Sequence, residues 1–275
     1  MDATVTDLQA TTRTKVVVVP IDDLTEADRA VEIGGHFAHA LGARLHLVSV
    51  DSVHAHPIRH DHDLADVARR SRRRATYEAL TTSTSVDAAV RDAVDAMDCP
   101  LVCITSHARS AIGELAFTSA SWALVRASRR PVIVSGPNAR WDRLSGSTVV
   151  VALDGSDHDR TIVDAAILLA NQAGVHHLHL ITIITDTNAA RMADRLIGHA
   201  QRIDRIGMVA SWELDATHGA APGIRHAAAM IDAPLTVVGT RGHTPLQRLI
   251  HGSTAAEVVR GSHRPVLIVP PCFEY

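Results

Sequence analysis

The sequence predicts an α/β fold in which two tandem domains each form an open five-stranded parallel sheet with helices on both faces. Hydrophobic residues make up 46% of the 275 residues but aromatic residues only 3%, so Ala, Val, Leu and Ile must build the cores. This composition suits Val-rich parallel strands buried beneath Ala-rich helices. Short apolar runs also alternate with segments of helical spacing, which is typical of a parallel sheet. The whole series occurs twice.

Five apolar runs in the first half predict strands, because each is short, rich in β-branched residues and bounded by turn or helix signals. The segment Gly136–Ser147 follows them as a linker, and Trp141 is expected to pack this linker against the protein. The expected strands are Val16–Ile21, Leu45–Val50, Ala75–Thr81, Leu101–Thr105 and Val132–Ser135.

The second half repeats this order and shows its helices more clearly. Ser156 or Asp157 is placed to cap the first helix, which should end near Ala173. Further helices are expected over Asn188–Ile206, Gly223–Ile231 and Ser253–Arg260. The expected strands are Thr148–Leu153, His177–Ile184, Val209–Ala216, Leu235–Val238 and Val266–Val269.

Four short segments recur about 130 residues later in the same order, which predicts a tandem duplication. We expect one domain over residues 1–136 and a second over residues 148–275. The matching segments are Val17–Asp22 with Val149–Asp154, Arg44–Val50 with His177–Ile183, Asp98–Leu101 with Asp232–Leu235, and Arg130–Val134 with Arg264–Ile268.

Charge and composition exclude several classes of protein. The net charge is −3, so no general basic field indicates nucleic acid or an anionic membrane as a partner. Lys15 is the only lysine, which excludes a P-loop lysine or a Schiff base elsewhere in the chain. The three cysteines form no disulfide framework, and no apolar run approaches the roughly 18 residues of a membrane helix. We therefore expect a soluble cytoplasmic protein.

Three glycines follow the expected fourth strand of the second half. Gly239 ends the strand, Gly242 permits a tight turn, and Gly252 with Ser253 stands at the start of a helix. A helix start favours an anion, because its backbone N–H groups are unpaired and its dipole is positive there. In a doubly wound sheet, ligands bind beyond the carboxyl ends of the strands. The pattern therefore predicts a phosphate-binding loop that needs no lysine.

The spacing of these glycines resembles that of a known family. Gly239-x2-Gly242-x9-Gly252-Ser253 reproduces the Gx2Gx9G[S/T] signature of the ATP-binding branch of the universal stress protein family. VALDGS at Val151–Ser156 is similar to that family's first strand and turn. The resemblance covers nearly the whole chain as two tandem domains, an arrangement similar to the two-domain members common in actinobacteria.

The resemblance implies a fold and a ligand. Family members have the strand order 3-2-1-4-5, so the turns after the first and fourth strands face one crevice. By resemblance, Asp154 contacts the ribose and adenine of ATP and Ile183 lies beside the adenine. The resemblance is also compatible with a Mg²⁺ ion bound between the phosphates, although the sequence has no local carboxylate cluster that would require one. The residues implied around the ribose and phosphates are Gly239, Arg241, Gly242, Gly252, Ser253 and Thr254.

The first half departs from this signature. Thr105, Ala108 and Thr118 stand where the second half has its three glycines, and Asp23 replaces Gly155. Side chains then occupy positions where bare backbone should approach phosphate. We expect the first domain to bind ATP weakly or not at all.

The resemblance also implies how domains pair. Family members commonly pair through their fifth strands, so Val132–Ser135 and Val266–Val269 are expected to face one another within one chain. Such pairing would cover strand edges that otherwise remain exposed. A homodimer is a further arrangement that the sequence leaves open.

Other signals identify neither a catalytic residue nor a metal ligand. The histidines between His54 and His62 are interpreted as a polar loop, and the arginines of Arg69–Arg74 as a solvated surface. We favour an ATP-dependent regulatory module. The alternatives are a slow ATPase, with His243 or His251 as the nearest candidate bases, and a scaffold that binds no nucleotide.

Overall fold

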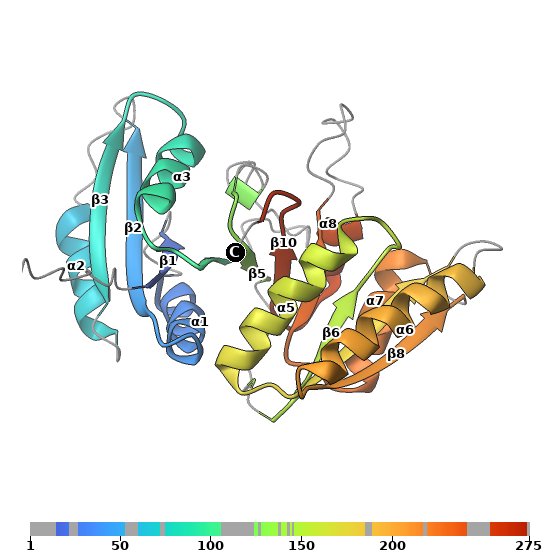
Figure 1. Cartoon of the computed structure of the whole chain (residues 1–275). Coiled ribbons are helices and arrows are strands. Elements are labelled where there is room, and N and C mark those ends of the chain that lie inside the picture. Colours follow the sequence, from blue (N-terminus) through green and yellow to red (C-terminus); the bar gives the residue numbers. More distant parts are fainter. Residues whose placement is uncertain are drawn as a thin grey trace, which may run out of the picture.

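The computed structural model contains one ten-stranded sheet, shown in Figure 1 with the first half in blue to green and the second in yellow to red. The strand order is β3-β2-β1-β4-β5-β10-β9-β6-β7-β8, so each half has the order 3-2-1-4-5 read from its outer edge. The predicted α/β fold is therefore confirmed. The structure describes residues 15–21, 27–52, 60–71, 75–105, 124–125, 128–136, 139–141, 144, 146–184, 189–216, 219–240 and 254–273.

The strands of the first half lie within a few residues of their expected bounds, and helices connect them. Its helices are α1 (Ala27–Ala40), α2 (His60–Arg70) and α3 (Val86–Ala96). Its strands are β1 (Val16–Pro20), β2 (Arg44–Ser52), β3 (Thr76–Thr82), β4 (Leu101–Thr105) and β5 (Val132–Ser135).

The second half repeats these elements. Its strands are β6 (Thr148–Ala152), β7 (His177–Ile183), β8 (Val209–Asp215), β9 (Thr236–Gly239) and β10 (Val266–Val269). Its helices are α5 (Asp159–Ala173), α6 (Ala189–Arg205), α7 (Ala220–Met230) and α8 (Thr254–Gly261).

The two halves meet where β5 and β10 pair antiparallel, whereas the neighbouring strands within each half are parallel. Ile133 lies opposite Leu267, and these two residues are equivalent in the sequence repeat. Val134 faces Val266 and Val132 faces Ile268, so the register is symmetric about the central pair. A local twofold axis therefore relates the two halves at their junction.

The two larger of three hydrophobic clusters among the described residues, one on each face of the sheet, run across this junction. The first core contains Phe37 of α1 together with Val163 of α5 and Leu196 of α6. The second contains Val94 of α3 together with Val258 of α8. Each core joins residues of both halves, so the sheet and its helices form one continuous packed structure.

The linker packs against the first half, as its single tryptophan predicts. The ring of Trp141 stacks on His36 with ring centres 5.2 Å apart and meets Phe37 edge-on at 4.6 Å. Arg29 of α1 donates hydrogen bonds to the carbonyl oxygens of Gly136 and Ala139, at 2.8 and 2.7 Å. These contacts fix the start of the linker against α1.

Candidate functional site

Four predicted site residues lie at the ends of their elements in the second half. Asp154 follows β6, Ile183 is the last residue of β7 and Gly239 is the last residue of β9. Since β7, β6 and β9 are consecutive in the sheet, their carboxyl ends share one edge. Thr254 is the exposed first residue of α8. The predicted residues Arg241, Gly242, Gly252 and Ser253 lie outside the described part of the chain.

The turn after β6 is shaped by Asp154 and Gly155. A carboxylate oxygen of Asp154 accepts a hydrogen bond from the backbone N–H of Ser156 at 3.0 Å, which closes the turn. Gly155 has φ +78°, and a Cβ atom there would lie 2.4 Å from the sulfur of Met192. Its left-handed backbone conformation favours glycine, and a side chain there would also have to displace the end of the Met192 side chain. The turn thus holds Asp154 at the carboxyl edge of the sheet.

Asp159 holds the same turn from inside the protein. Its carboxylate accepts hydrogen bonds from the backbone N–H groups of Asp154 at 3.1 Å and Gly155 at 3.0 Å, and the residue is only 2% exposed. Arg195 of α6 donates to the carbonyl oxygen of Ser156 at 3.0 Å from the other side. The backbone of the turn is therefore fixed by charged side chains of two helices.

The sequence prediction of the cap of α5 was wrong. His158, and neither Ser156 nor Asp157, is the N-cap residue of this helix, and its side chain makes no capping hydrogen bond. The acidic side chain of Asp159 bonds instead to the turn that precedes the helix. Sequence reasoning missed Asp159, although its position three and four residues before the buried Ile162 and Val163 places it on the inner face of α5.

Burial raises the pKa of Asp159 to about 6. Desolvation is the main cause, and the nearby Asp154 raises this pKa further. The hydrogen bonds from the N–H groups of Asp154 and Gly155, and the charge of Arg195, act in the opposite direction. The carboxyl group therefore changes charge at a mildly acidic pH, next to the candidate site.

We predict that Asp159 makes the stability of the protein depend on pH. Its folded pKa of about 6 lies above its ordinary value of 3.8, so folded protein binds the proton more tightly than the unfolded chain. The contribution of this group to the unfolding free energy is thus greatest below pH 4. It falls by up to about 3 kcal/mol as the pH rises to 6 and above.

Urea denaturation of the wild type and of an Asp159→Asn variant at several pH values tests this prediction. The unfolding free energy of the wild type minus that of the variant should fall between pH 4 and pH 7. A difference that stays constant over this range would show that Asp159 does not titrate there.

The structure gives Gly239 a packing role. A Cβ atom at this position would lie 2.5 Å from Cδ1 of Ile162 and 3.3 Å from Cε1 of His158. The glycine therefore allows α5 to approach the end of β9 closely.

The Nε2 atom of His158 is buried there with no hydrogen-bond partner among the described residues. Desolvation lowers the pKa of this imidazole, against the smaller influences of the Pro270 carbonyl and Asp154.

A polar network on β7 and β8 contains the two histidines His177 and His179. The hydroxyl of Ser211 lies 2.8 Å from Nε2 of His177 and 2.8 Å from Nδ1 of His179. His179 also faces Glu213, with its Nε2 3.6 Å from a carboxylate oxygen. The hydrogen-bonding groups of these histidines are thus largely satisfied by neighbouring strands.

Among the described residues, no group of three His, Cys, Asp or Glu side chains is placed to hold a metal ion.

Comparison with known proteins identifies the family. The model of the universal stress protein family matches residues 13–135 and 209–270, which is more than half of the chain. The chain therefore belongs to the universal stress protein family. No match is found among curated proteins.

Solved structures share the architecture over almost the whole chain. A candidate universal stress protein from Pseudomonas aeruginosa is 20% identical over 94% of both chains, with a TM-score of 0.68. A universal stress protein from Archaeoglobus fulgidus is 17% identical over 93% of this chain and 96% of its own, with a TM-score of 0.64. At these identities the likeness concerns the fold alone.

Within the described residues, no helix is long and apolar enough to cross a membrane.

Proposed function

We propose that this protein binds ATP at the carboxyl edge of β7, β6 and β9, and that nucleotide occupancy regulates its conformation or its choice of protein partner. The observation that carries this proposal is the position of Asp154, Ile183 and Gly239 at the ends of three neighbouring strands. In open α/β sheets, ligands bind beyond the carboxyl ends of strands. Regulation requires that ATP bind one conformation more tightly than another.

The described residues fit an adenine nucleotide in three respects. Asp154 is exposed and its turn is fixed from both sides, so its carboxylate is a preorganised acceptor for ribose hydroxyls or adenine. Ile183 is half-buried and offers an apolar surface to a base. Thr254 begins α8, and the start of a helix favours phosphate. Mg²⁺, where it is bound, would neutralise charge between the phosphates.

We propose further that the two halves are tandem domains of the ATP-binding branch and that the second half holds the nucleotide. Thr105 ends β4 at the position that Gly239 has at the end of β9. The first half therefore carries a side chain where the second has none. We propose that the pairing of β5 with β10 is the family's pairing of fifth strands, contained in one chain.

The experiment is to identify and count the bound nucleotide. The full chain is purified, denatured, and the released small molecules are identified by mass. Refolded or nucleotide-free protein is then titrated with ATP by calorimetry. We expect one ATP site per chain and a rise in the midpoint of thermal unfolding with ATP, since a ligand of the native state stabilises it. Two equivalent sites would contradict the asymmetry, and no site with no thermal shift would contradict ATP binding itself.

A further inference from the structure

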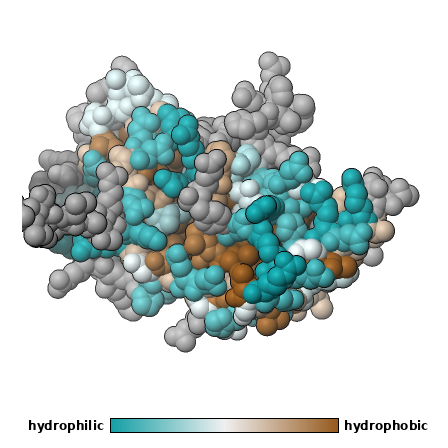
Figure 2. Space-filling view, in the orientation of Figure 1, coloured by the Kyte–Doolittle hydropathy of each residue, from teal (hydrophilic) through white to brown (hydrophobic). Residues whose placement is uncertain are grey.

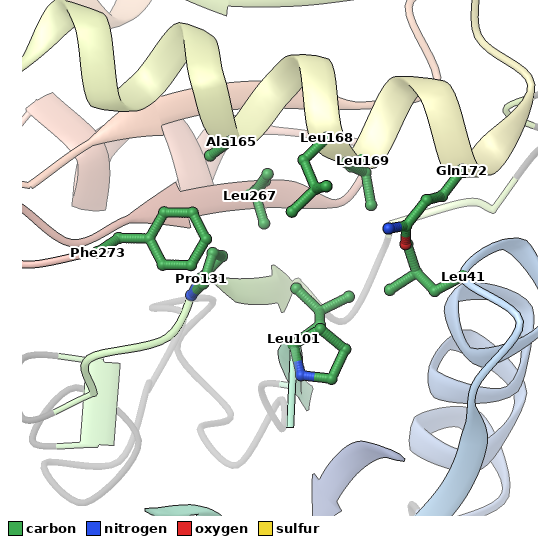
Figure 3. A pocket seen from close by; sticks show the side chains of 10 residues that line it. Leu41, Leu101, Pro131, Ala165, Leu168, Leu169, Gln172, Leu267 and Phe273 are labelled. Atoms are coloured by element: carbon green, nitrogen blue, oxygen red, sulfur yellow. The ribbon is translucent and has the colours of Figure 1, made fainter. Parts of the chain in front are cut away.

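A small apolar pocket lies between the two halves, on the face of the sheet that α1 and α5 cover (Figure 3). Figure 2 shows hydrophobic residues, in brown, gathered at the middle of this side of the molecule. The cavity has a volume of about 30 Å³, which is room for water but not for an organic ligand. The pocket is therefore a gap in the packing of the two halves.

A hydroxyl, two imidazoles and a carboxylate lie together on one face of β7 and β8. The Oγ atom of Ser211 is 2.8 Å from Nδ1 of His179 and 2.8 Å from Nε2 of His177. On its other side, Nε2 of His179 lies 3.6 Å from a carboxylate oxygen of Glu213. Nδ1 of His177 lies 3.1 Å from the hydroxyl oxygen of Thr148 on β6. A serine, an imidazole and a carboxylate in this sequence of contacts form the arrangement that activates serine nucleophiles.

The chemistry of these groups gives the hydrogen bonds a direction. A carboxylate only accepts, so the charge of Glu213 favours the form of His179 that carries its proton on Nε2. Nδ1 of His179 is then unprotonated and accepts the proton of the Ser211 hydroxyl. Burial lowers the pKa of His177, and the nearby His179 lowers it further, so this second imidazole is neutral. Its Nε2–H donates to the Ser211 oxygen, and the serine proton therefore faces a base.

The face of β8 that carries Ser211 is open to solvent. Val209 and Glu213 lie two residues to either side of Ser211 and therefore on the same face. Val209 is 56% exposed, and the side chain of Glu213 is 45% exposed. On this face α7 packs over β6 and β7, and β8 is the last strand of the sheet. A small molecule can therefore approach the half-buried Ser211 from the side of β8.

The free edge of β8 supplies a hydrogen-bond donor next to Ser211. The N–H of Ala210 points away from β7, because it donates to a carboxylate oxygen of Asp204 at 3.1 Å. The backbone of a strand repeats every second residue, so the N–H of Trp212 points to the same open edge. An N–H group beside the nucleophile is the donor that a negatively charged carbonyl oxygen requires during acyl transfer.

We propose that Ser211 is the nucleophile of a catalytic site that cleaves short-chain carboxylic esters. The Ser211 oxygen forms a bond to the ester carbonyl carbon while its proton passes to Nδ1 of His179. The ester C–O bond then breaks, and the leaving alkoxide takes this proton. Water, deprotonated by the same imidazole, releases the acid and restores the serine. Val209 offers a single small apolar surface beside Ser211, which suits a short acyl chain.

The first half carries a weaker form of the same arrangement at the equivalent positions of β2 and β3. Nδ1 of His46 lies 2.8 Å from the hydroxyl oxygen of Thr76, and Nε2 of His46 lies 3.9 Å from a carboxylate oxygen of Glu78. The Thr76 hydroxyl also lies 3.4 Å from the carbonyl oxygen of Leu45, which competes with His46 for its single proton. We therefore expect Thr76 to be unreactive, which makes it a matched control within the chain.

Labelling of the full chain with a fluorophosphonate probe tests the proposal, because such probes phosphonylate activated serines with loss of fluoride. Peptide mass analysis should place the label on Ser211, and the protein should hydrolyse p-nitrophenyl acetate without ATP. Ser211→Ala should abolish both reactions. His179→Gln should lower the labelling rate at least about 100-fold, since it removes the general base. Thr76→Ala should leave labelling and hydrolysis unchanged.

Circular dichroism and the midpoint of thermal unfolding establish that each variant is folded. If His179→Gln fails to fold, Glu213→Gln gives the same test, because this half-exposed side chain acts through His179. Its labelling rate should fall at least about tenfold. Failure of the folded wild type to label at Ser211 would overturn the proposal. Labelling of these variants at the wild-type rate would overturn it too, since His179 would then not act as a base.

Discussion

An Asp154→Asn variant should bind ATP at least about tenfold more weakly than the wild type while keeping its fold. A hydrogen bond to a charged carboxylate contributes about 1.5–3 kcal/mol, and about 1.4 kcal/mol is a factor of ten in affinity. The amide oxygen of asparagine still accepts the bond from the N–H of Ser156 that closes the turn. The loss should therefore reflect the charge of Asp154 rather than a collapse of the turn.

The matched control is Asp22→Asn, since Asp22 is the equivalent residue of the first half. Calorimetric titration of both variants with ATP should show weaker binding for Asp154→Asn alone. If Asp22→Asn had the larger effect, the first half would be the nucleotide site. If neither variant changed the affinity, ATP would bind away from this edge of the sheet.

The positions of the strands along the chain could be predicted because the sequence presents the series twice. Their order in the sheet, 3-2-1-4-5, was implied by the resemblance to the universal stress protein family. Apolar runs of four to seven residues in β6, β7 and β10 match their expected strands within a few residues. The start of α7 was less evident, because Pro222 and Gly223 look like breakers. In the structure this helix begins at Ala220, with Gly219 as its N-cap residue. Pro222 falls in the first turn, where a missing N–H removes no hydrogen bond.

The candidate site was predictable in part. The ends of β6, β7 and β9 follow from the strand order, so the shared edge of Asp154, Ile183 and Gly239 could be predicted. The packing around this edge could not, because it depends on which helix approaches each strand. Gly239 accommodates Ile162 of α5, and Asp159 supports the turn from within the core. The spacing of Asp159 before Ile162 and Val163 indicates the inner face of α5 but does not identify the turn as its partner. The contact of Gly239 with Ile162 has no local pattern in the sequence.

An Ile133→Asp variant should lose at least about 4 kcal/mol of unfolding free energy, because it buries a charge without a partner. Ile133 is fully buried, faces Leu267 across the junction and lies beside Cys103 on β4. Its core contains Phe37 of α1 and Val163 of α5, so the damage should reach both halves. An Ile133→Val variant, which keeps the site apolar, should cost only about 0.5–1.5 kcal/mol.

Denaturation followed by hydrogen exchange distinguishes one cooperative structure from two independent domains. In Ile133→Asp, amide protection should fall together in β2 and β7, which lie far apart in the sheet on either side of the junction. The control is Ile206→Asp, because Ile206 is 51% exposed and an added charge there remains in water. Loss of protection in β2 with β7 unchanged would mean that the second half is stable without the first. The antiparallel contact of β5 with β10 would then join the halves without coupling their stability.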